Sequence, residues 1–127
     1  MKLLLDTQAL LFAINPLERL GSATRELLAD PSVERYVSAI SLWEIAVKVR
    51  IGKLPLPSNR TFYLRHLEAL QARLLAVEIR HSFAMFDLPL HHKDPFDRML
   101  IAQAFEDGLT LVTQDREFAA YGVPTVW

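Results

Sequence analysis

The sequence predicts an α/β fold, specifically a three-layer sandwich in which helices flank a central, mostly parallel sheet of four to five strands. Short apolar segments of strand length alternate along the chain with longer segments whose apolar residues recur at helical spacing. Turn residues, mainly Pro, Gly, Asn and Asp, separate the two kinds of segment. The 127 residues contain no repeat, low-complexity tract or linker. We therefore expect one domain over residues 1–127.

The first half of the chain is bounded by residues that begin or end helices. The expected elements are a strand over 2–5, helices over 7–14 and 24–29, a strand over 34–39 and a helix over 41–51. The first apolar run stops at Asp6, as a buried strand does. The next segment is apolar almost all round, which indicates a helix that is buried or used at an interface, and Asn15-Pro16 ends it. Ser22 and Ser41 are typical caps of the two later helices, and Gly52 ends the second of them.

The second half repeats the alternation of helix and strand. The expected elements are a helix over 61–73, a strand over 74–79, a short helix over 82–86, a helix between Asp94 and Gly108, and strands over 109–113 and 123–127. The first of these helices rests on an amphipathic spacing of apolar residues. Asp94-Pro95 combines a capping side chain with a proline at the first helical position, and Gly108 is a typical helix end.

Composition excludes several classes of protein. The absence of cysteine removes disulfides, thiolate zinc sites and cysteine nucleophiles, and it fits a cytoplasmic location. No apolar run reaches the roughly 18 residues of a membrane span, so we expect no membrane partner. The formal net charge is −1, which gives no overall basic field to attract nucleic acid. A surface that handles phosphate must therefore be local or use bound cations.

Carboxylates stand at the predicted strand ends and helix starts. Asp6 ends the first strand, and Glu44 lies in the first turn of the helix after the second strand. Asp115 follows the fourth strand, while Asp94 and Asp97 begin the helix that leads into it. These positions share one edge of a parallel sheet, so we expect the carboxylates to converge there. Clustered carboxylates repel one another, and a hard divalent cation such as Mg²⁺ would relieve the repulsion and polarise a phosphodiester.

Each of these acids also has a purely structural interpretation. The segment Ser41–Glu44 has the form of a capping box, with its glutamate at the third helical position. Asp94 and Asp97 fit the same pattern as the cap and the third residue of their helix. Asp6 could cap the first helix, and Asp115 could belong to a turn. The pattern alone leaves both interpretations open.

Four blocks of sequence carry a family resemblance. They are Leu3–Thr7, Ser38–Ile45, His92–Arg98 with Ile101–Ala104, and Leu111–Asp115 with Phe118. Taken together and in this order, they resemble the PIN domain, and more narrowly the VapC-type ribonuclease toxins of type II toxin–antitoxin pairs. The resemblance implies a PIN-like parallel sheet between helices and a Mg²⁺- or Mn²⁺-dependent endoribonuclease that cleaves RNA. It also implies a homodimer and a cognate antitoxin whose tail occupies a groove beside the acids.

The resemblance also implies a catalytic and metal-binding set. Its four members fall on Asp6, Glu44, Asp97 and Asp115. We expect Asp6 and Asp97 to hold the main cation, and the other two to orient the water or hold a second ion. Asp94 would contact a metal through water or only cap its helix. Thr113 would orient a ligand or a water through its hydroxyl, with Thr7 as a second supporting residue.

Several further residues have a possible role in binding. Arg98 and Arg116, next to two of the acids, could contact backbone phosphates. We interpret His91-His92 as loop histidines, because no partner lies at ligand spacing. Four aromatic residues could stack on bases, although core packing is favoured for the first and last of them: Trp43, Phe62, Tyr63 and Phe96. The apolar helix and the Phe62-Tyr63 pair could instead form a dimer or antitoxin surface.

Three other functions compete with this hypothesis. A receiver-like phosphotransfer domain would need an acid pair after the first strand and a late lysine, but Thr7-Gln8 follows Asp6 and no lysine follows Lys93. A haloacid-type phosphatase would need an aspartate where Gln8 stands. The third alternative is a non-catalytic PIN-like module that binds RNA or a protein partner. The complete set of four acids argues against it.

Overall fold

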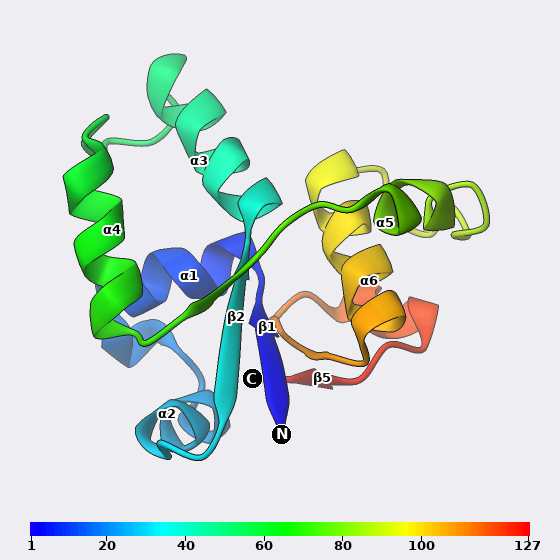
Figure 1. Cartoon of the computed structure of the whole chain (residues 1–127), viewed down its shortest axis with the longest axis horizontal. Coiled ribbons are helices and arrows are strands. Elements are labelled where there is room, and N and C mark those ends of the chain that lie inside the picture. The colour runs from blue at the N-terminus through cyan, green and yellow to red at the C-terminus, as the bar shows by residue number, and fades with distance from the viewer.

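A single sheet of five parallel strands forms the centre of the computed structural model, which describes residues 1–127 (Figure 1). The strands lie in the order β3-β2-β1-β4-β5. Their bounds are Lys2–Leu5 for β1, Glu34–Ser38 for β2, Arg73–Leu75 for β3, Thr110–Val112 for β4 and Thr125–Val126 for β5. All four strand pairs are parallel. The predicted fold class is therefore confirmed.

Helices cover the sheet and connect its strands. Their bounds are Thr7–Ile14 for α1, Ser22–Ala29 for α2, Ala39–Arg50 for α3, Arg60–Ala69 for α4, Ile79–Ala84 for α5 and Pro95–Asp107 for α6. Two 3-10 segments, η1 (Leu17–Arg19) and η2 (Arg116–Tyr121), were not predicted. None of the helices has the length and hydrophobicity that crossing a membrane requires.

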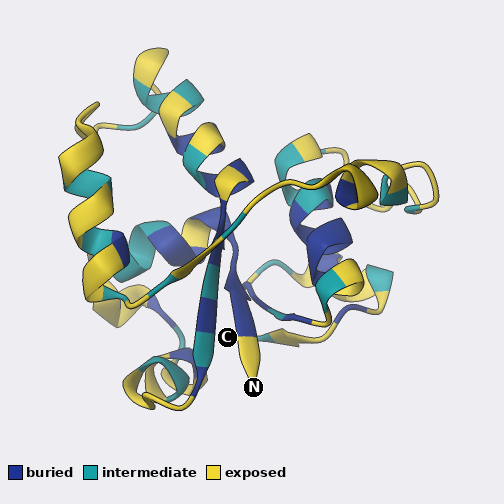
Figure 2. Ribbon diagram, in the orientation of Figure 1, coloured by how far each residue is buried: buried dark blue, intermediate teal, exposed yellow.

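The three layers follow from the alternation of side chains along the central strand β1. Leu4 packs on one face of the sheet, in the apolar cluster that contains Leu100 and Ile101 of α6. Leu3 and Leu5 point to the other face, where α1 and α2 pack. All three leucines are fully buried, as Figure 2 shows for the middle of the sheet. A central strand covered on both sides reads as a continuous apolar run, which is why the sequence identified it.

The boundaries of several helices differ from the prediction. Ser22 is the first residue of α2 and not its cap, because Gly21 precedes the helix. Helix α3 begins at Ala39, two residues early, since the Ser38 hydroxyl accepts a hydrogen bond from the Ile40 amide at 3.1 Å and starts the helix directly after β2. Helix α4 ends at Ala69, four residues before its predicted end, and α5 begins three residues before its predicted start.

A buried polar network joins β2 to α5 and α6. The Ser38 hydroxyl donates to the Gln103 side-chain oxygen at 2.6 Å, and the Gln103 amide donates to the Ala76 carbonyl at 3.1 Å. The Gln103 amide nitrogen lies 3.5 Å from Nδ1 of His81, whose Nε2 lies 2.9 Å from the Asp107 carboxylate. We call these side chains, Ser38, His81, Gln103 and Asp107, the Gln103 network.

Candidate metal and catalytic site

The carboxyl ends of β1, β2 and β4 lie side by side, because Leu5 is in register with both Val37 and Val112. The segments that follow these ends, together with the start of α6, enclose a pocket of about 340 Å³. All five predicted acids line it: Asp6, Glu44, Asp94, Asp97 and Asp115. We call this pocket the acidic cleft. The expectation that acids distant in sequence meet at one sheet edge is therefore met by the structure.

Asp6 both caps α1 and faces the cleft. Its Oδ1 accepts a hydrogen bond from the Ala9 amide at 2.7 Å, and the residue is only 6% exposed. Burial raises the pKa of Asp6 to about 6, although hydrogen bonds from Thr113 and Ala9 oppose the rise. Both hydrogen-bond partners are uncharged. The negative charge of Asp6 therefore has no cation beside it.

Glu44 lies in the second turn of α3 rather than the first. The predicted capping box is wrong, because Ser38 caps the helix and so leaves Glu44 free of the helix terminus. One carboxylate oxygen accepts a hydrogen bond from the Thr7 hydroxyl at 2.6 Å, and the other pairs with Lys48 at 2.5 Å. Glu44 is 4% exposed. It is thus a buried acid that is paired with Lys48 and hydrogen-bonded to Thr7.

The start of α6 supplies two further acids, Asp94 and Asp97, both half-buried. The Asp94 side chain accepts hydrogen bonds from the amides of Phe96 and Asp97, so its predicted role as a helix cap is confirmed. Burial raises the pKa of Asp97 to about 7, and the negative charge of Asp94 adds to the rise while His92 lowers it. Asp97 and Asp6 are therefore two acids of the cleft whose pKa is raised well above its ordinary value.

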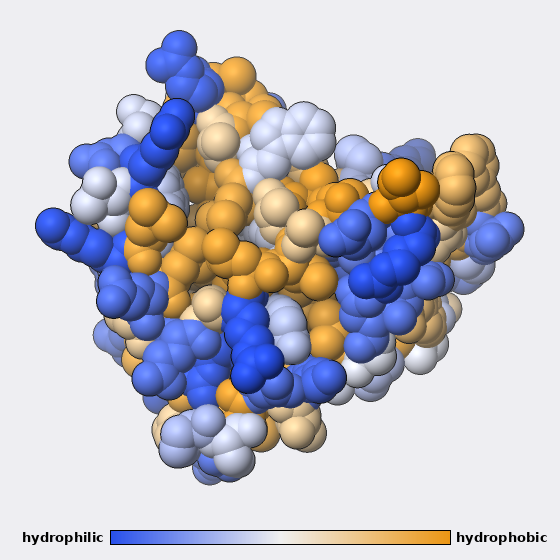
Figure 3. Space-filling model, viewed as in Figure 1, coloured by the Kyte–Doolittle hydropathy of each residue, from blue (hydrophilic) through white to orange (hydrophobic).

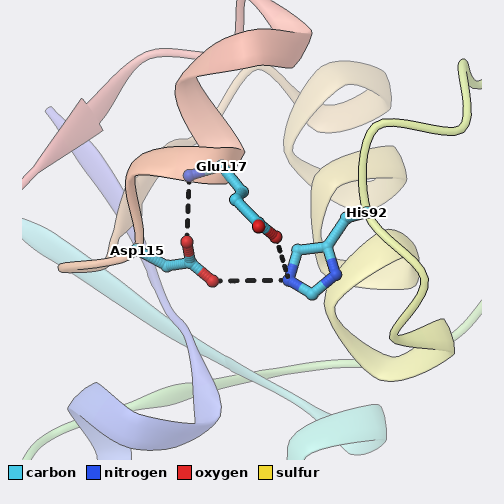
Figure 4. Close-up of side chains that lie close together, drawn as sticks. All are labelled: His92, Asp115 and Glu117. Atoms are coloured by element: carbon cyan, nitrogen blue, oxygen red, sulfur yellow. Dashed lines mark hydrogen bonds and ion pairs between the residues drawn. The ribbon is translucent and has the colours of Figure 1, made fainter.

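Asp115 lies at the start of η2 and contacts a histidine that the sequence analysis dismissed (Figure 4). The Asp115 amide donates to the Thr113 hydroxyl at 3.1 Å, and the Asp115 side chain caps η2. His92 Nε2 lies 3.1 Å from Asp97, 3.3 Å from Asp115 and 3.5 Å from Glu117. His92, Asp115 and Glu117 are close enough to share a metal ion. The available signal was the place of His92 in the same sequence block as Asp94 and Asp97.

The two predicted phosphate contacts lie in different surroundings. Arg98 is buried, and its guanidinium donates to the carbonyls of Pro89 and Leu88 and to the Tyr121 hydroxyl. It therefore holds the loop before α6, and we leave it out of the proposed phosphate contacts. Arg116 is exposed beside Asp115 and is free to meet an anion.

Aromatic and apolar side chains flank the cleft. Trp43 is 61% exposed, so the preference for core packing is wrong at this position; its ring meets Phe96 edge to face at 5.9 Å. Phe96 is half-buried and packs against the core, as expected. Figure 3 shows apolar side chains gathered between α3 and α4. They line a groove of about 390 Å³ that includes Leu42, Ile45, Val49, Tyr63 and Leu67.

The chemistry of the acidic cleft fits a divalent cation. Its donors are carboxylate oxygens, the ligands that Mg²⁺ and Mn²⁺ prefer. Lys48 balances Glu44 and His92 faces Asp115, but the charge of Asp6 has only neutral partners. Burial raises the pKa of both Asp6 and Asp97, repulsion from neighbouring carboxylates adds to the rise, and a cation between the two would oppose both effects.

Comparisons with known proteins find one matching family model and several solved structures with a similar fold. Residues 3–124 match the sequence model of the PIN domain. No curated protein sequence matches significantly. Similar solved structures include VapBC2 from Rickettsia felis bound to a DNA fragment from its promoter (TM-score 0.74, 18% identity, covering 99% of this chain and 98% of that chain). DNA-bound VapBC from Salmonella typhimurium is also similar (TM-score 0.68, 20% identity, covering 99% of this chain and 97% of that chain). So is a toxin–antitoxin complex from Klebsiella pneumoniae (TM-score 0.64, 22% identity, covering 98% of this chain and 95% of that chain).

Proposed function

We propose that this chain, which belongs to the PIN domain family, is a divalent-metal-dependent endoribonuclease and the toxin of a toxin–antitoxin pair. One observation carries the proposal. Five carboxylates from four separate elements line one cleft, and burial raises the pKa of Asp6 to about 6 and of Asp97 to about 7. Helix capping alone does not account for two carboxylates with raised pKa values in one cleft, whereas the binding of a cation does.

The proposed roles follow the charge balance of the cleft. Asp6 and Asp97 hold the main Mg²⁺ or Mn²⁺ ion, because burial raises the pKa of both and a cation beside them would favour their charged forms. Glu44 and Asp115 complete the site, and Thr113 fixes both Asp6 and the Asp115 backbone. The bound ion supplies polarisation of the scissile phosphate and lowers the pKa of a water.

RNA meets a protein with no overall positive charge. The net charge of −1 provides no general attraction, so phosphate contacts are local, and Arg116 is the exposed candidate next to the acids. This favours a narrow substrate over general RNA degradation. Weak overall attraction also means that binding relies on the metal.

Two protein partners belong to the proposal. An antitoxin segment would bury apolar side chains in the groove between α3 and α4. Helix α3, which forms one wall of the groove, is also the helix that carries Glu44. A second copy of the chain would cover the exposed apolar residues around β3 and α5, among them Leu74, Ile79 and Phe83. Light scattering of the purified chain measures the second contact directly, with twice the monomer mass expected.

The deciding experiment is cleavage of a mixed RNA pool by antitoxin-free protein. Assays with Mg²⁺, with Mn²⁺ and with EDTA run beside the variant Asp97→Asn. We expect cutting that needs the metal and that the variant lacks while remaining folded by circular dichroism. A folded wild-type protein that cuts nothing with either metal would instead favour the non-catalytic binding module.

A further inference from the structure

His92 is held in place more firmly than a loop residue requires. It lies between α5 and α6, where the Tyr121 hydroxyl accepts hydrogen bonds from the amides of His91 and His92 at 3.1 and 2.8 Å. Arg98 fastens the same loop through the carbonyls of Leu88 and Pro89. The loop backbone is thereby anchored at Leu88, Pro89 and His91, just before the imidazole, and at His92 itself.

The imidazole ring itself is also fixed. It packs edge to face on Phe118 at 5.8 Å, and its Nδ1 accepts a hydrogen bond from the Asp94 amide at 3.1 Å. The side chain is only 14% exposed. Two contacts therefore direct Nε2 toward the carboxylates, and Figure 4 shows it facing Asp115 and Glu117.

The hydrogen bond at Nδ1 determines what Nε2 can do. A neutral imidazole has one N–H and one free lone pair, and here the Asp94 amide uses the lone pair of Nδ1. The proton therefore sits on Nε2, which donates to Asp115 at 3.3 Å and lies 3.1 Å from the Asp97 carboxylate. A metal ligand needs the opposite arrangement, with a free lone pair on the nitrogen that faces the ion.

We propose that His92 is a positioning residue of the acidic cleft: its Nε2–H donates to Asp115 of η2, its ring lies against the Asp97 carboxylate of α6, and the imidazole thereby sets the separation of the two acids for the cation. The proposal rests on the proposed function only in assuming that the cleft binds a divalent ion. It assigns His92 to the surroundings of the metal and not to its ligands. The proximity of His92, Asp115 and Glu117 is then the result of hydrogen bonding.

The two roles differ in metal selectivity. A residue that only positions carboxylates should affect the binding of every divalent ion by a similar factor. Loss of an imidazole ligand would weaken Ni²⁺, which favours nitrogen, much more than Mg²⁺, which favours oxygen. Removing a hydrogen-bond partner of a metal ligand typically weakens metal affinity 10- to 100-fold.

The test uses the full chain with three variants. His92→Ala removes the donor, and His92→Gln keeps an N–H at the same number of bonds from the backbone. His91→Ala is the matched control, because that ring packs on Tyr121 and none of its side-chain contacts is with the acids. Calorimetry gives the dissociation constants of Mg²⁺ and Ni²⁺, and ¹⁵N NMR of the metal-free wild type reports which ring nitrogen of His92 carries the proton.

We expect His92→Ala to raise both dissociation constants by about tenfold, His92→Gln to restore most of the loss, and His91→Ala to change neither. The NMR spectrum should show a protonated Nε2 and an unprotonated Nδ1. A selective loss of Ni²⁺ binding, equal affinities in all variants, or a protonated Nδ1 with a bare Nε2 would overturn the proposal. These readouts need no RNA, so a wild type that binds metal as expected yet cuts no RNA would refute only the nuclease function.

Discussion

Helix α6 carries acids near both of its ends, and the two ends differ in how their charges are balanced. At its start, Asp97 lies in the acidic cleft, where burial raises its pKa to about 7. At its end, Asp107 accepts hydrogen bonds from His81 and Arg80. Burial would raise the pKa of Asp107, but these bonds outweigh it and keep the pKa below its ordinary value.

The difference separates a structural polar group from a functional one. The Gln103 network is closed: Ser38, Gln103 and His81 find partners inside the protein, and Asp107 finds cationic or N–H donors. The acidic cleft is open, since its five carboxylates face one lysine and one histidine. A closed network rigidifies the fold, whereas an open one destabilises it and indicates a ligand.

The largest difference in RNA cleavage should appear when an aspartate is replaced by asparagine in the acidic cleft and, separately, in the Gln103 network. Asp6→Asn removes a proposed metal ligand and should reduce RNA cleavage by at least roughly 1000-fold, about 4 kcal/mol of transition-state stabilisation. Asp107→Asn should leave cleavage within about twofold of wild type, because the introduced amide oxygen still accepts from His81. Initial rates at saturating Mg²⁺ measure both. Equal losses in the two variants would erase the distinction between the regions.

Removing the centre of the closed network should instead affect stability. Gln103→Leu removes the acceptor of the buried Ser38 hydroxyl and the donor that bonds the Ala76 carbonyl. We expect the free energy of unfolding to fall by about 2–3 kcal/mol, measured by urea titration. Cleavage per folded molecule should be unchanged. Glu106→Gln, on the exposed face of α6, is the control and should change neither quantity.

The sequence predicted the sheet, the helices and the convergence of the acids, because these follow from strand alternation and from the shared edge of parallel strands. It misplaced the start of α3, since the capping hydroxyl of Ser38 lies on the last residue of a strand. It also missed His92, whose contacts depend on how a loop packs against Phe118 and Tyr121. Partners fixed by tertiary packing leave no periodic signal in the chain.

A smaller effect should appear in the metal-free protein as a function of pH. Below about pH 4 Asp97 is protonated whether the chain is folded or unfolded, so Asp97→Asn changes little. As the pH rises from about 4 toward 8, the unfolded chain ionises Asp97 more readily than the folded protein, in which its pKa is about 7. The stability of the folded wild type therefore falls over this range. Asp97→Asn should therefore be more stable than wild type by about 1–2 kcal/mol at pH 8, measured by urea titration in EDTA.

The contribution of Asp97 to that pH dependence can be checked in the same series. Asp107→Asn should show the opposite sign, because the pKa of Asp107 is lowered in the folded protein and its ionised form is stabilising above the ordinary pKa. A gain of stability in both variants at pH 8 would mean that general charge repulsion, and not the local imbalance of the cleft, sets the effect.

Adding the ion should close most of the stability difference between wild type and Asp97→Asn, and this is the smallest shift of the set. At a Mg²⁺ concentration ten times the dissociation constant, binding to the folded state alone stabilises the wild type by about 1.4 kcal/mol. That corresponds to a rise in Tm of a few degrees, roughly 3–5 °C for a domain of this size.

Asp97→Asn, which lacks a ligand charge, should show no rise, whereas Gln103→Leu should show the full rise from a lower starting Tm. Because the closed network and the open cleft share α6, an undiminished Mg²⁺ response in Gln103→Leu would mean that the cleft binds its ion independently of the network. A weakened response would mean that the network also holds the acids in place.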